Sequence, residues 1–414
     1  MTRTDPDRSL HLAHADDLAA RSGADLLAAL LAQGVQTAPN LSRAELLAAF
    51  YAHLLSQGQH VLVTGALELL PEGFGFVRSP HLDYEASACD AFVTPSQVRA
   101  LNLKAGHQVT GALRAPRGNE RFFALSHIES VNGIDPARLV TRVAFAARTP
   151  MVATRPLALA GDDALRTLAF LAPWCRGQRV LVTAPPLWSR SPWLAQLAAA
   201  LRTGDAGLRL YLCLLDQRPE DVAAVRAQLA PFAGCEVTGS TFGQVAERHV
   251  ALTEMVLARA QRDVEAGHDV VLLVDSLTAL VQASQRAQPA SGRWLCAGLD
   301  AQAVWLAKRL FAAARACAEG GSLTVIATAL GAAAGTVDAA VLAEFHHRGN
   351  SDVVIDAESA ALAAAAPFDA MATRTRPEDD DREASTLAAV QQLRRDWLQA
   401  AAAERVRLLV APRR

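Results

Sequence analysis

Hydrophobic residues near the start of the chain recur every three or four positions, which is the spacing of amphipathic helices. The pattern covers the runs GADLLAALLAQG (23–34) and SRAELLAAFYAHLLSQG (42–58). Ser42 suits an N-cap, and Gly58 suits the end of the second helix. We therefore predict short helices from residue 10 to residue 57, within an N-terminal helical subdomain over residues 1–58.

The pattern then changes to short runs of β-forming residues separated by turns. These runs are VLVTGALELL, GFGFVRS, DAFVTP, HQVTGALRA and RFFALSHIESV. Several short strands at this spacing are typical of a small β-barrel. We assign the barrel to residues 59–135 and a connector to residues 136–175.

From Gly177 onward, apolar strand-like runs alternate with helical segments. The runs are RVLVTA, RLYLCLLD, CEVTGS, DVVLLVDS, SLTVIATAL and DVVIDA. Apolar strands that alternate with helices predict a largely parallel sheet covered by helices. We assign this α/β domain to residues 176–384 and a C-terminal helix to residues 385–414.

Composition and charge narrow the class of protein. Apolar residues make up 51% of the chain, but no uninterrupted apolar run reaches the length of a membrane span, so no membrane partner is expected. The six cysteines lie far apart and form no CxxC pair, which excludes a zinc motif or a disulfide framework and favours the reducing cytoplasm. The net charge is −2, so nucleic-acid binding would have to come from local geometry.

One barrel run has the chemistry of a surface for unpaired bases. In GFGFVRS, Phe74, Phe76 and Arg78 are spaced two apart, so a strand would place them on one face. Exposed rings on a small barrel stack on single-stranded bases, and the arginine could meet phosphate or stack. The alternative is that both phenylalanines fill the barrel core.

The order and spacing of many motifs resemble the bacterial transcription termination factor Rho family, over roughly residues 20 to 380. The matching stretches include GALELLPEGFGFVRS, NERFFAL, GSTFGQVAERHVALTEMVLARA, VVLLVDSLTAL and EFHHRGN. The resemblance implies an OB-type (cold-shock-like) barrel after the helical subdomain, and then a RecA-like P-loop ATPase domain. It also implies a primary site for C-rich single-stranded RNA at Phe74, Phe76, Arg78, Asp90, Phe92, Glu120, Arg121 and Phe122.

The loop TAPPLWSRSPW, residues 183–193, departs from the family's nucleotide-binding loop. By resemblance, Ser189 replaces a glycine, Arg190 replaces the phosphate-binding lysine, and Ser191 replaces a threonine that holds Mg²⁺. A phosphate loop needs glycine so that backbone N–H groups can wrap the anion, and the planar arginine fork is not a point charge. Ser191 and Asp275 are the residues that would hold Mg²⁺, so Mg-ATP is a cofactor only if this altered loop still binds it.

Other positions of the implied ATPase site are also altered. The family's catalytic glutamate becomes Gln217, which cannot act as a general base, and Arg218 follows it as a nucleotide contact. The adenine-stacking phenylalanine becomes Ala365, and Arg376 aligns with the arginine finger. These changes predict loss of ATP hydrolysis.

The resemblance implies a second RNA contact inside a ring of subunits. Arg293 in PASGRWLCAG and Arg348 in EFHHRGN would keep positive charge there, and the alternative is two solvated basic loops. The expected partners are single-stranded RNA, further copies of this chain or Rho subunits in a ring, and RNA polymerase.

Three readings of the function stay open. The first is an RNA-binding Rho homologue that cannot hydrolyse ATP and that either binds RNA alone or enters a Rho ring and modulates it. The second is an active ATP-dependent RNA helicase that terminates transcription, and the third is a relic whose RNA surface is also idle. The retained pair Phe74 and Phe76 argues against the third, and Gln217 argues against the second.

Overall fold

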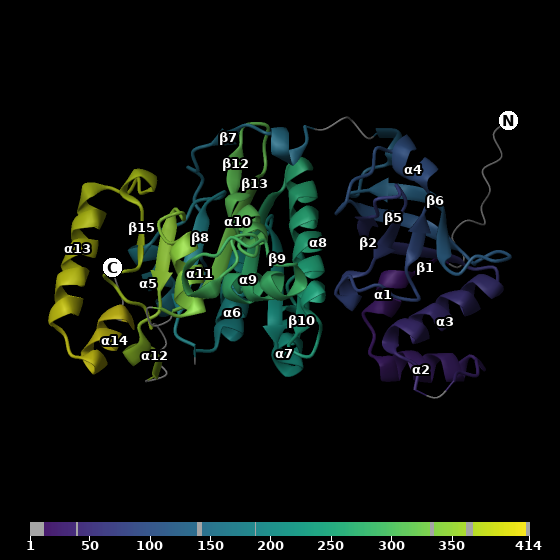
Figure 1. Cartoon of the computed structure of the whole chain (residues 1–414), viewed down its shortest axis with the longest axis horizontal. Coiled ribbons are helices and arrows are strands. Elements are labelled where there is room, and N and C mark those ends of the chain that lie inside the picture. The colour runs from purple at the N-terminus through teal and green to yellow at the C-terminus, as the bar shows by residue number, and fades with distance from the viewer. Residues whose placement is uncertain are drawn as a thin grey trace. The chain divides into compact units, whose positions relative to one another are not determined.

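The computed structural model describes residues 12–38, 40–138, 143–186, 188–331, 335–361 and 367–410. Contacts divide the chain into two compact units, Met1–Arg142 and Val143–Arg414. Figure 1 draws the first unit in purple to blue and the second mostly in teal to yellow. Among the helices in the described ranges, none is long and apolar enough to span a membrane.

The first unit begins with three helices, α1 (Ala15–Ala19), α2 (Gly23–Ala32) and α3 (Arg43–Ser56). Ser42 caps α3 in a reciprocal capping box with Glu45, as the sequence predicts. One difference is β1 (Leu12–His14), which lies in the segment predicted to be helical and pairs in parallel with the next strand. Pairing with a neighbouring edge satisfies its backbone groups, which local periodicity does not reveal.

The predicted barrel is present and closes on itself. The strands run in the order β1-β2-β3-β4-β6-β5, and β5 pairs back to β2. Leu67, Val77, Val93 and Val109 are part of one core that also receives Leu47 from α3. The barrel elements are β2 (His60–Leu69), β3 (Gly75–Arg78), β4 (Ala91–Val93), α4 (Pro95–Ala100), β5 (Gln108–Arg114) and β6 (Phe123–Val131).

The second unit contains a sheet in the order β10-β9-β11-β13-β8-β14-β15. All neighbours from β10 to β14 are parallel, and β15 is antiparallel to β14. The strands are β8 (Arg179–Ala184), β9 (Arg209–Gln217), β10 (Cys235–Thr241), β11 (Asp269–Asp275), β13 (Ser322–Leu330), β14 (Ser351–Val354) and β15 (Arg374–Thr375).

Most side chains of the central strands of this sheet are fully buried, which requires cover on both faces of the sheet. Helices provide this cover (Figure 1). They are α5 (Asp163–Leu171), α6 (Arg190–Gly204), α7 (Pro219–Leu229), α8 (Ala246–Glu265), α9 (Leu277–Ala287), α10 (Trp305–Ala312), α11 (Val337–Phe345), α12 (Ala357–Ala361), α13 (Ala384–Gln399) and α14 (Ala402–Val410).

Two segments differ from their sequence assignments. Much of the connector at 136–175 belongs to the second unit, because β7 (Pro150–Met151) pairs with β12 (Arg315–Cys317) and α5 packs into the core. The C-terminal segment forms two helices instead of one. Ala400 leaves the helical region with ψ of 146°, and both helices then contribute to the core, through Trp397 and Leu409.

Candidate nucleic-acid and nucleotide sites

Four phenylalanine rings gather on the outer face of the barrel. Phe76 lies on β3 directly opposite Phe92 on β4, while Phe74 and Phe122 lie just before β3 and β6. The ring of Phe76 is 6.0 Å from Phe74, 5.7 Å from Phe92 and 5.1 Å from Phe122, between centroids. All three pairs meet edge to face, a favoured geometry of aromatic contacts.

Within the cluster, the four rings differ in exposure. Phe122 is 45% exposed, Phe74 and Phe92 are half-buried, and Phe76 is only 8% exposed. Phe76 is buried, although it lies outside the hydrophobic cluster that contains its neighbour Val77. The expectation of two exposed rings on one strand is therefore wrong for Phe76, which contacts the other three rings.

Arg78 supports the aromatic cluster from below. Its guanidinium pairs with Glu68 and Asp90, and its central carbon lies 4.9 Å from the centre of the Phe76 ring. Arg78 is only 8% exposed. The expectation that Arg78 meets phosphate or stacks on a base is therefore corrected, because its fork is already occupied by two carboxylates.

Asp90 completes this buried network beneath the rings. It accepts hydrogen bonds from the backbone N–H and the hydroxyl of Ser87, at 2.5 and 2.9 Å. Burial raises the pKa of Asp90, and the positive charge of Arg78 and the Ser87 hydrogen bonds oppose that rise. Asp90 thus positions Arg78 and the loop before β4 instead of facing a ligand.

Glu120 and Arg121 lie on the loop before β6, beside Phe122. Glu120 accepts hydrogen bonds from both terminal nitrogens of Arg114, at 2.5 and 2.8 Å, and from the N–H of Arg117 at 2.9 Å. These hydrogen bonds lower the pKa of Glu120 to about 2, and Arg114 makes the largest contribution. Arg121 is exposed. Sequence reasoning missed Glu68 and Arg114, because only cross-strand pairing brings them to this surface.

The predicted strand, loop and helix around residues 183–193 are present, with Arg190 as the first residue of α6. The Nε atom of Arg190 donates to Oδ1 of Asp275 at 2.8 Å. Asp275 ends β11 and is fully buried. Trp188 packs on Trp193 with ring centres 5.5 Å apart, so the bulky residue turns into the protein core.

The remaining contacts of Asp275 also come from its own chain. The Ser191 hydroxyl lies 2.9 Å from Oδ2 of Asp275 and 3.1 Å from Oε1 of Gln217. The Thr328 hydroxyl donates to Oδ1 of Asp275 at 2.9 Å. Sequence reasoning missed Thr328, which β13 places beside the end of β11. Both oxygens of the carboxylate are therefore engaged by protein donors.

Two further nucleotide-site predictions lie elsewhere. Arg218 forms a bidentate pair with Asp221 at 2.8 and 2.9 Å on the exposed start of α7. The backbone N–H of Arg376 bonds to the carbonyl of Asn350, which precedes β14, so Arg376 lies at the amino edge of the sheet. Arg190 and Asp275 lie at the opposite, carboxyl edge. Residue Ala365 falls outside the described residues.

The two candidate channel arginines are both exposed. Arg293 lies between α9 and α10. Asp300 holds this segment in place, because its carboxylate accepts hydrogen bonds from the backbone N–H and the hydroxyl of Ser291, at 2.7 and 2.8 Å. Arg348 follows α11, and its Nε donates to the carbonyl of Glu344 at 2.6 Å. The neighbour of Arg293, Trp294, lines one pocket, while Arg348 lines another.

Comparison with known proteins finds a family model for the barrel and a solved structure of similar fold. Residues 63–137 match the family model described as the RNA-binding domain of Rho termination factor. A solved ATPase from the type III secretion system of pathogenic bacteria resembles the chain with a TM-score of 0.54 and 18% identity. That likeness covers 70% of this chain and 78% of the other. The predicted fold class, an OB-type barrel followed by a RecA-like ATPase domain, is confirmed.

Full-length relatives extend the match over nearly the whole chain. Transcription termination factor Rho of Cereibacter sphaeroides is 37% identical over 385 residues, which covers 92% of this chain and 90% of that protein. Rho of Aquifex aeolicus is 38% identical over 328 residues, covering 78% of this chain and 75% of that protein. The chain therefore belongs to the transcription termination factor Rho family.

Proposed function

We propose that this chain is a Rho-type transcription termination factor homologue that binds C-rich single-stranded RNA but does not hydrolyse ATP. The observation that carries the second half of the proposal is the ion pair between Arg190 and Asp275. The aromatic cluster carries the first half. In this reading the chain modulates a true Rho by entering its ring or by competing for its RNA.

The aromatic cluster supports RNA binding through stacking. Phe74, Phe92 and Phe122 present ring surface to solvent, and Phe76 holds them together from beneath. Each base stacked on an aromatic ring contributes about 1–3 kcal/mol. Such contacts do not require a positive surface, which fits a chain of net charge −2.

The Arg190–Asp275 pair supports the loss of ATPase activity. Phosphoryl transfer in this fold uses a lysine on the outer phosphates and Mg²⁺ held by a hydroxyl and a carboxylate. Here the carboxylate of Asp275 is neutralised by Arg190 and hydrogen-bonded to Thr328. The residues present do not fit Mg-ATP, because the cation site is occupied by a guanidinium and the loop from Val180 to Trp193 has no glycine.

Gln217 removes the base that would activate water. Its Oε1 faces the Ser191 hydroxyl, and its Nε2 donates to the carbonyl of Leu215 at 2.9 Å. An amide cannot accept a proton near neutral pH, so the side chain can orient water but not deprotonate it. Even a nucleotide that displaced Arg190 would meet a site without its catalytic carboxylate.

A poly(C) and ATP assay on the purified full chain tests the proposal. We expect retention of poly(C) on a filter and no RNA-stimulated release of phosphate from Mg-ATP. The Cereibacter sphaeroides Rho serves as the positive control for the ATPase assay under identical conditions. RNA-stimulated phosphate release by this chain would instead support an active helicase that terminates transcription.

A mixing experiment tests the proposed partner. Tagged chain and untagged Rho from the same cell are combined with RNA and separated by size. We expect the chain to elute with Rho and to change the ATPase rate of the mixture. Separate elution with an unchanged rate would restrict the proposal to an RNA-binding protein that acts without Rho.

A further inference from the structure

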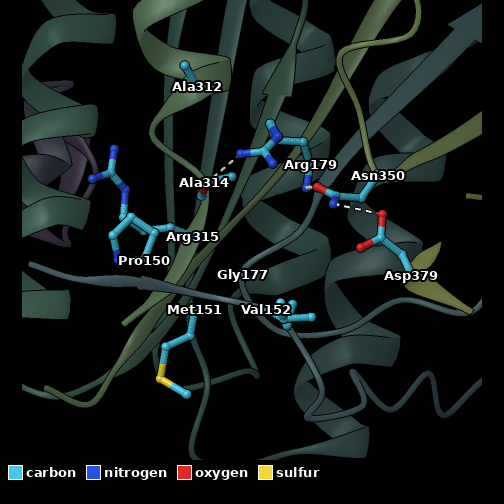
Figure 2. A pocket seen from close by; sticks show the side chains of 11 residues that line it. Pro150, Met151, Val152, Gly177, Arg179, Ala312, Ala314, Arg315, Asn350 and Asp379 are labelled. Atoms are coloured by element: carbon cyan, nitrogen blue, oxygen red, sulfur yellow. Dashed lines mark hydrogen bonds between the residues drawn. The ribbon is translucent and has the colours of Figure 1, made fainter. Parts of the chain in front are cut away.

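Two adjoining pockets lie at the amino edge of the sheet, opposite the Arg190–Asp275 site. The larger, shown in Figure 2, has a volume of 470 Å³. The smaller has a volume of 300 Å³. Arg179, the first residue of β8, and Ala312, at the end of α10, line both pockets. We call the pair the amino-edge cleft.

Positive charge dominates the lining of this cleft. Arg315 lines the larger pocket, and Lys308 and Arg348 line the smaller one, with Arg179 between them. The larger pocket also contains the carboxylate of Asp379. Lys308 pairs with Glu344. Four cationic side chains therefore line the two pockets with one carboxylate, and a second carboxylate outside the lining pairs with Lys308, which leaves a positive excess.

Arg179 is held in place by the backbone but keeps spare donors. Its terminal nitrogen donates to the carbonyl of Ala314 at 2.9 Å, and its own N–H donates to Asn350 Oδ1 at 2.9 Å (Figure 2). Asn350 in turn donates to Asp379 at 3.0 Å. A guanidinium has five N–H donors, and this one uses one of them in the contacts described.

The burial of Arg179 and the cations around it disfavour its positive charge when no anion is bound nearby. Burial lowers the pKa of Arg179, and the nearby charges of Arg376 and Arg315 act in the same direction, against the opposing effect of Asp379. An arginine remains protonated in proteins, so Arg179 cannot relieve this unfavourable energy by losing its proton. A half-buried arginine with further cations beside it attracts an anion of matching size.

We propose that the smaller pocket of the amino-edge cleft binds a phosphate group against Arg179, with Lys308 and Arg348 lining the same pocket. The tetrahedral anion would accept hydrogen bonds from the unused donors of these three side chains. Phe311 and Phe345, whose ring centres are 5.7 Å apart, pack together behind the smaller pocket and are almost fully buried. Inorganic phosphate, a nucleotide and an RNA terminus share the required chemistry.

The choice of phosphate over a carboxylate follows from the number and spread of the cations. A phosphate monoester carries close to two negative charges and three acceptor oxygens near neutral pH. One carboxylate would satisfy fewer of the donors that Arg179 and Arg348 offer in the smaller pocket. The cleft also differs from the site of the proposed function, because none of its lining residues contacts Arg190 or Asp275 in the described structure.

Calorimetric titration of the full chain with inorganic phosphate at constant ionic strength tests the site. We expect saturable heat for the wild type and about ten-fold weaker binding for Arg348→Gln, because a charge-assisted contact is lost. Arg348 is exposed, so this variant should fold normally. Arg166→Gln on α5, an exposed arginine outside the cleft, is the matched control and should bind like the wild type.

Two further arms separate this site from the altered nucleotide loop and identify the ligand source. Arg190→Gln should leave phosphate binding unchanged, whatever its effect on ATP. Adenosine monophosphate and a dinucleotide with or without a 5′-phosphate are compared next. Tighter binding of a phosphorylated form, abolished by Arg348→Gln, identifies a nucleotide or an RNA terminus as the ligand, and equal binding of all phosphates identifies free phosphate. No saturable heat in the wild type, or equal affinities for Arg348→Gln and Arg166→Gln, would overturn the proposal.

Discussion

Phe122 and Phe76 touch each other in the same aromatic cluster, yet they serve it differently. Phe122 is 45% exposed and free to meet a base, whereas Phe76 is 8% exposed and supports the other rings. An exposed ring such as that of Phe122 can stack on a base but adds little to the stability of the fold. A covered ring such as that of Phe76 stabilises the fold, and it affects RNA binding only by supporting the rings that contact it.

Replacement of the two rings separates these roles. Phe122→Ala should weaken oligo(C) binding by about 1–3 kcal/mol and leave the urea midpoint unchanged. Phe76→Ala should lower stability by on the order of 3 kcal/mol, with loss of binding as a consequence. Fluorescence anisotropy with labelled oligo(C) and urea unfolding measure the two effects. Wild-type affinity in Phe122→Ala would show that RNA does not stack on this cluster.

Asp269, the first residue of β11, links three segments through hydrogen bonds. It accepts from Arg155 at 2.5 and 2.9 Å, from Arg176 at 2.7 Å and from Ser322 at 2.7 Å. Burial by itself would raise the pKa of Asp269, but these bonds outweigh it and the net pKa is lowered below 3.8. The folded state therefore favours the ionised carboxylate.

The sign of this shift fixes a pH dependence. A carboxyl group with a depressed pKa in the folded state contributes stability above its unfolded pKa, near 3.8, and loses it as the pH falls below that value. Asp269→Asn should therefore be less stable than the wild type at pH 7, and the difference should shrink as the pH approaches 3. Urea unfolding at both pH values measures it, and a constant difference would contradict the assignment.

At the scale of elements, the approach of β3 to β2 positions the aromatic cluster. Gly75 faces Leu69 across this pair, and a Cβ atom there would overlap with the carbonyl oxygen of Glu68. Only glycine allows the two backbones to approach this closely. The close approach in turn fixes Phe74 and Phe76 on either side of Gly75.

Gly75→Ala should separate β2 from β3 and disturb the cluster. We expect weaker oligo(C) binding together with a lower melting temperature of the barrel. Gly118→Asn is the control, because Gly118 has open space around it and a φ of +56° that asparagine tolerates. Equal RNA binding by the two variants would show that the β2–β3 spacing does not control the surface.

The Arg190–Asp275 pair is one of the contacts between α6 and β11, beside the hydrogen bond from Ser191 to Asp275. Removal of one partner of a buried pair leaves the other charge uncompensated and costs about 3–5 kcal/mol. Arg190→Gln should therefore lower the free energy of unfolding of the second unit by about 3 kcal/mol, the lower end of that range. The reason is that Ser191 and Thr328 still donate to Asp275. Arg190→Lys should retain most of the stability. Unchanged unfolding of Arg190→Gln would indicate that the pair does not form in solution.

At the scale of the whole molecule, each unit has its own hydrophobic core. The first core includes Leu47 and Val109, and the second includes Leu194 and Val271. The residues of the aromatic cluster and their supporting ion pairs all lie in the first unit. The RNA surface should therefore not need the second unit for its formation.

Expression of residues 1–142 alone tests this independence. The fragment should fold cooperatively and bind a short oligo(C) with the affinity of the full chain under the same conditions. Longer RNA should bind the full chain more tightly if Arg293 or Arg348 adds a second contact. A folded fragment that fails to bind short oligo(C) would place the primary RNA site elsewhere.

The sequence predicted much of this arrangement because it depends on local pattern. Short β-forming runs separated by turns predicted the barrel strands, and alternation of apolar runs with helices predicted the covered parallel sheet. The identity of Arg190 and Gln217 in the nucleotide loop is also a property of the sequence alone. These inferences need only the residue types and their spacing.

Tertiary structure alone decided which charged groups are available. Arg78 meets Glu68 on β2 and Asp90 just before β4, the two strands next to its own, and Arg190 meets Asp275 from a distance of 85 residues along the chain. The short β1 and the packing of α5 depend in the same way on distant partners. The physical reason is that strand order brings such partners together, while local pattern carries no information about which distant side chain will neutralise a charge or satisfy a backbone group.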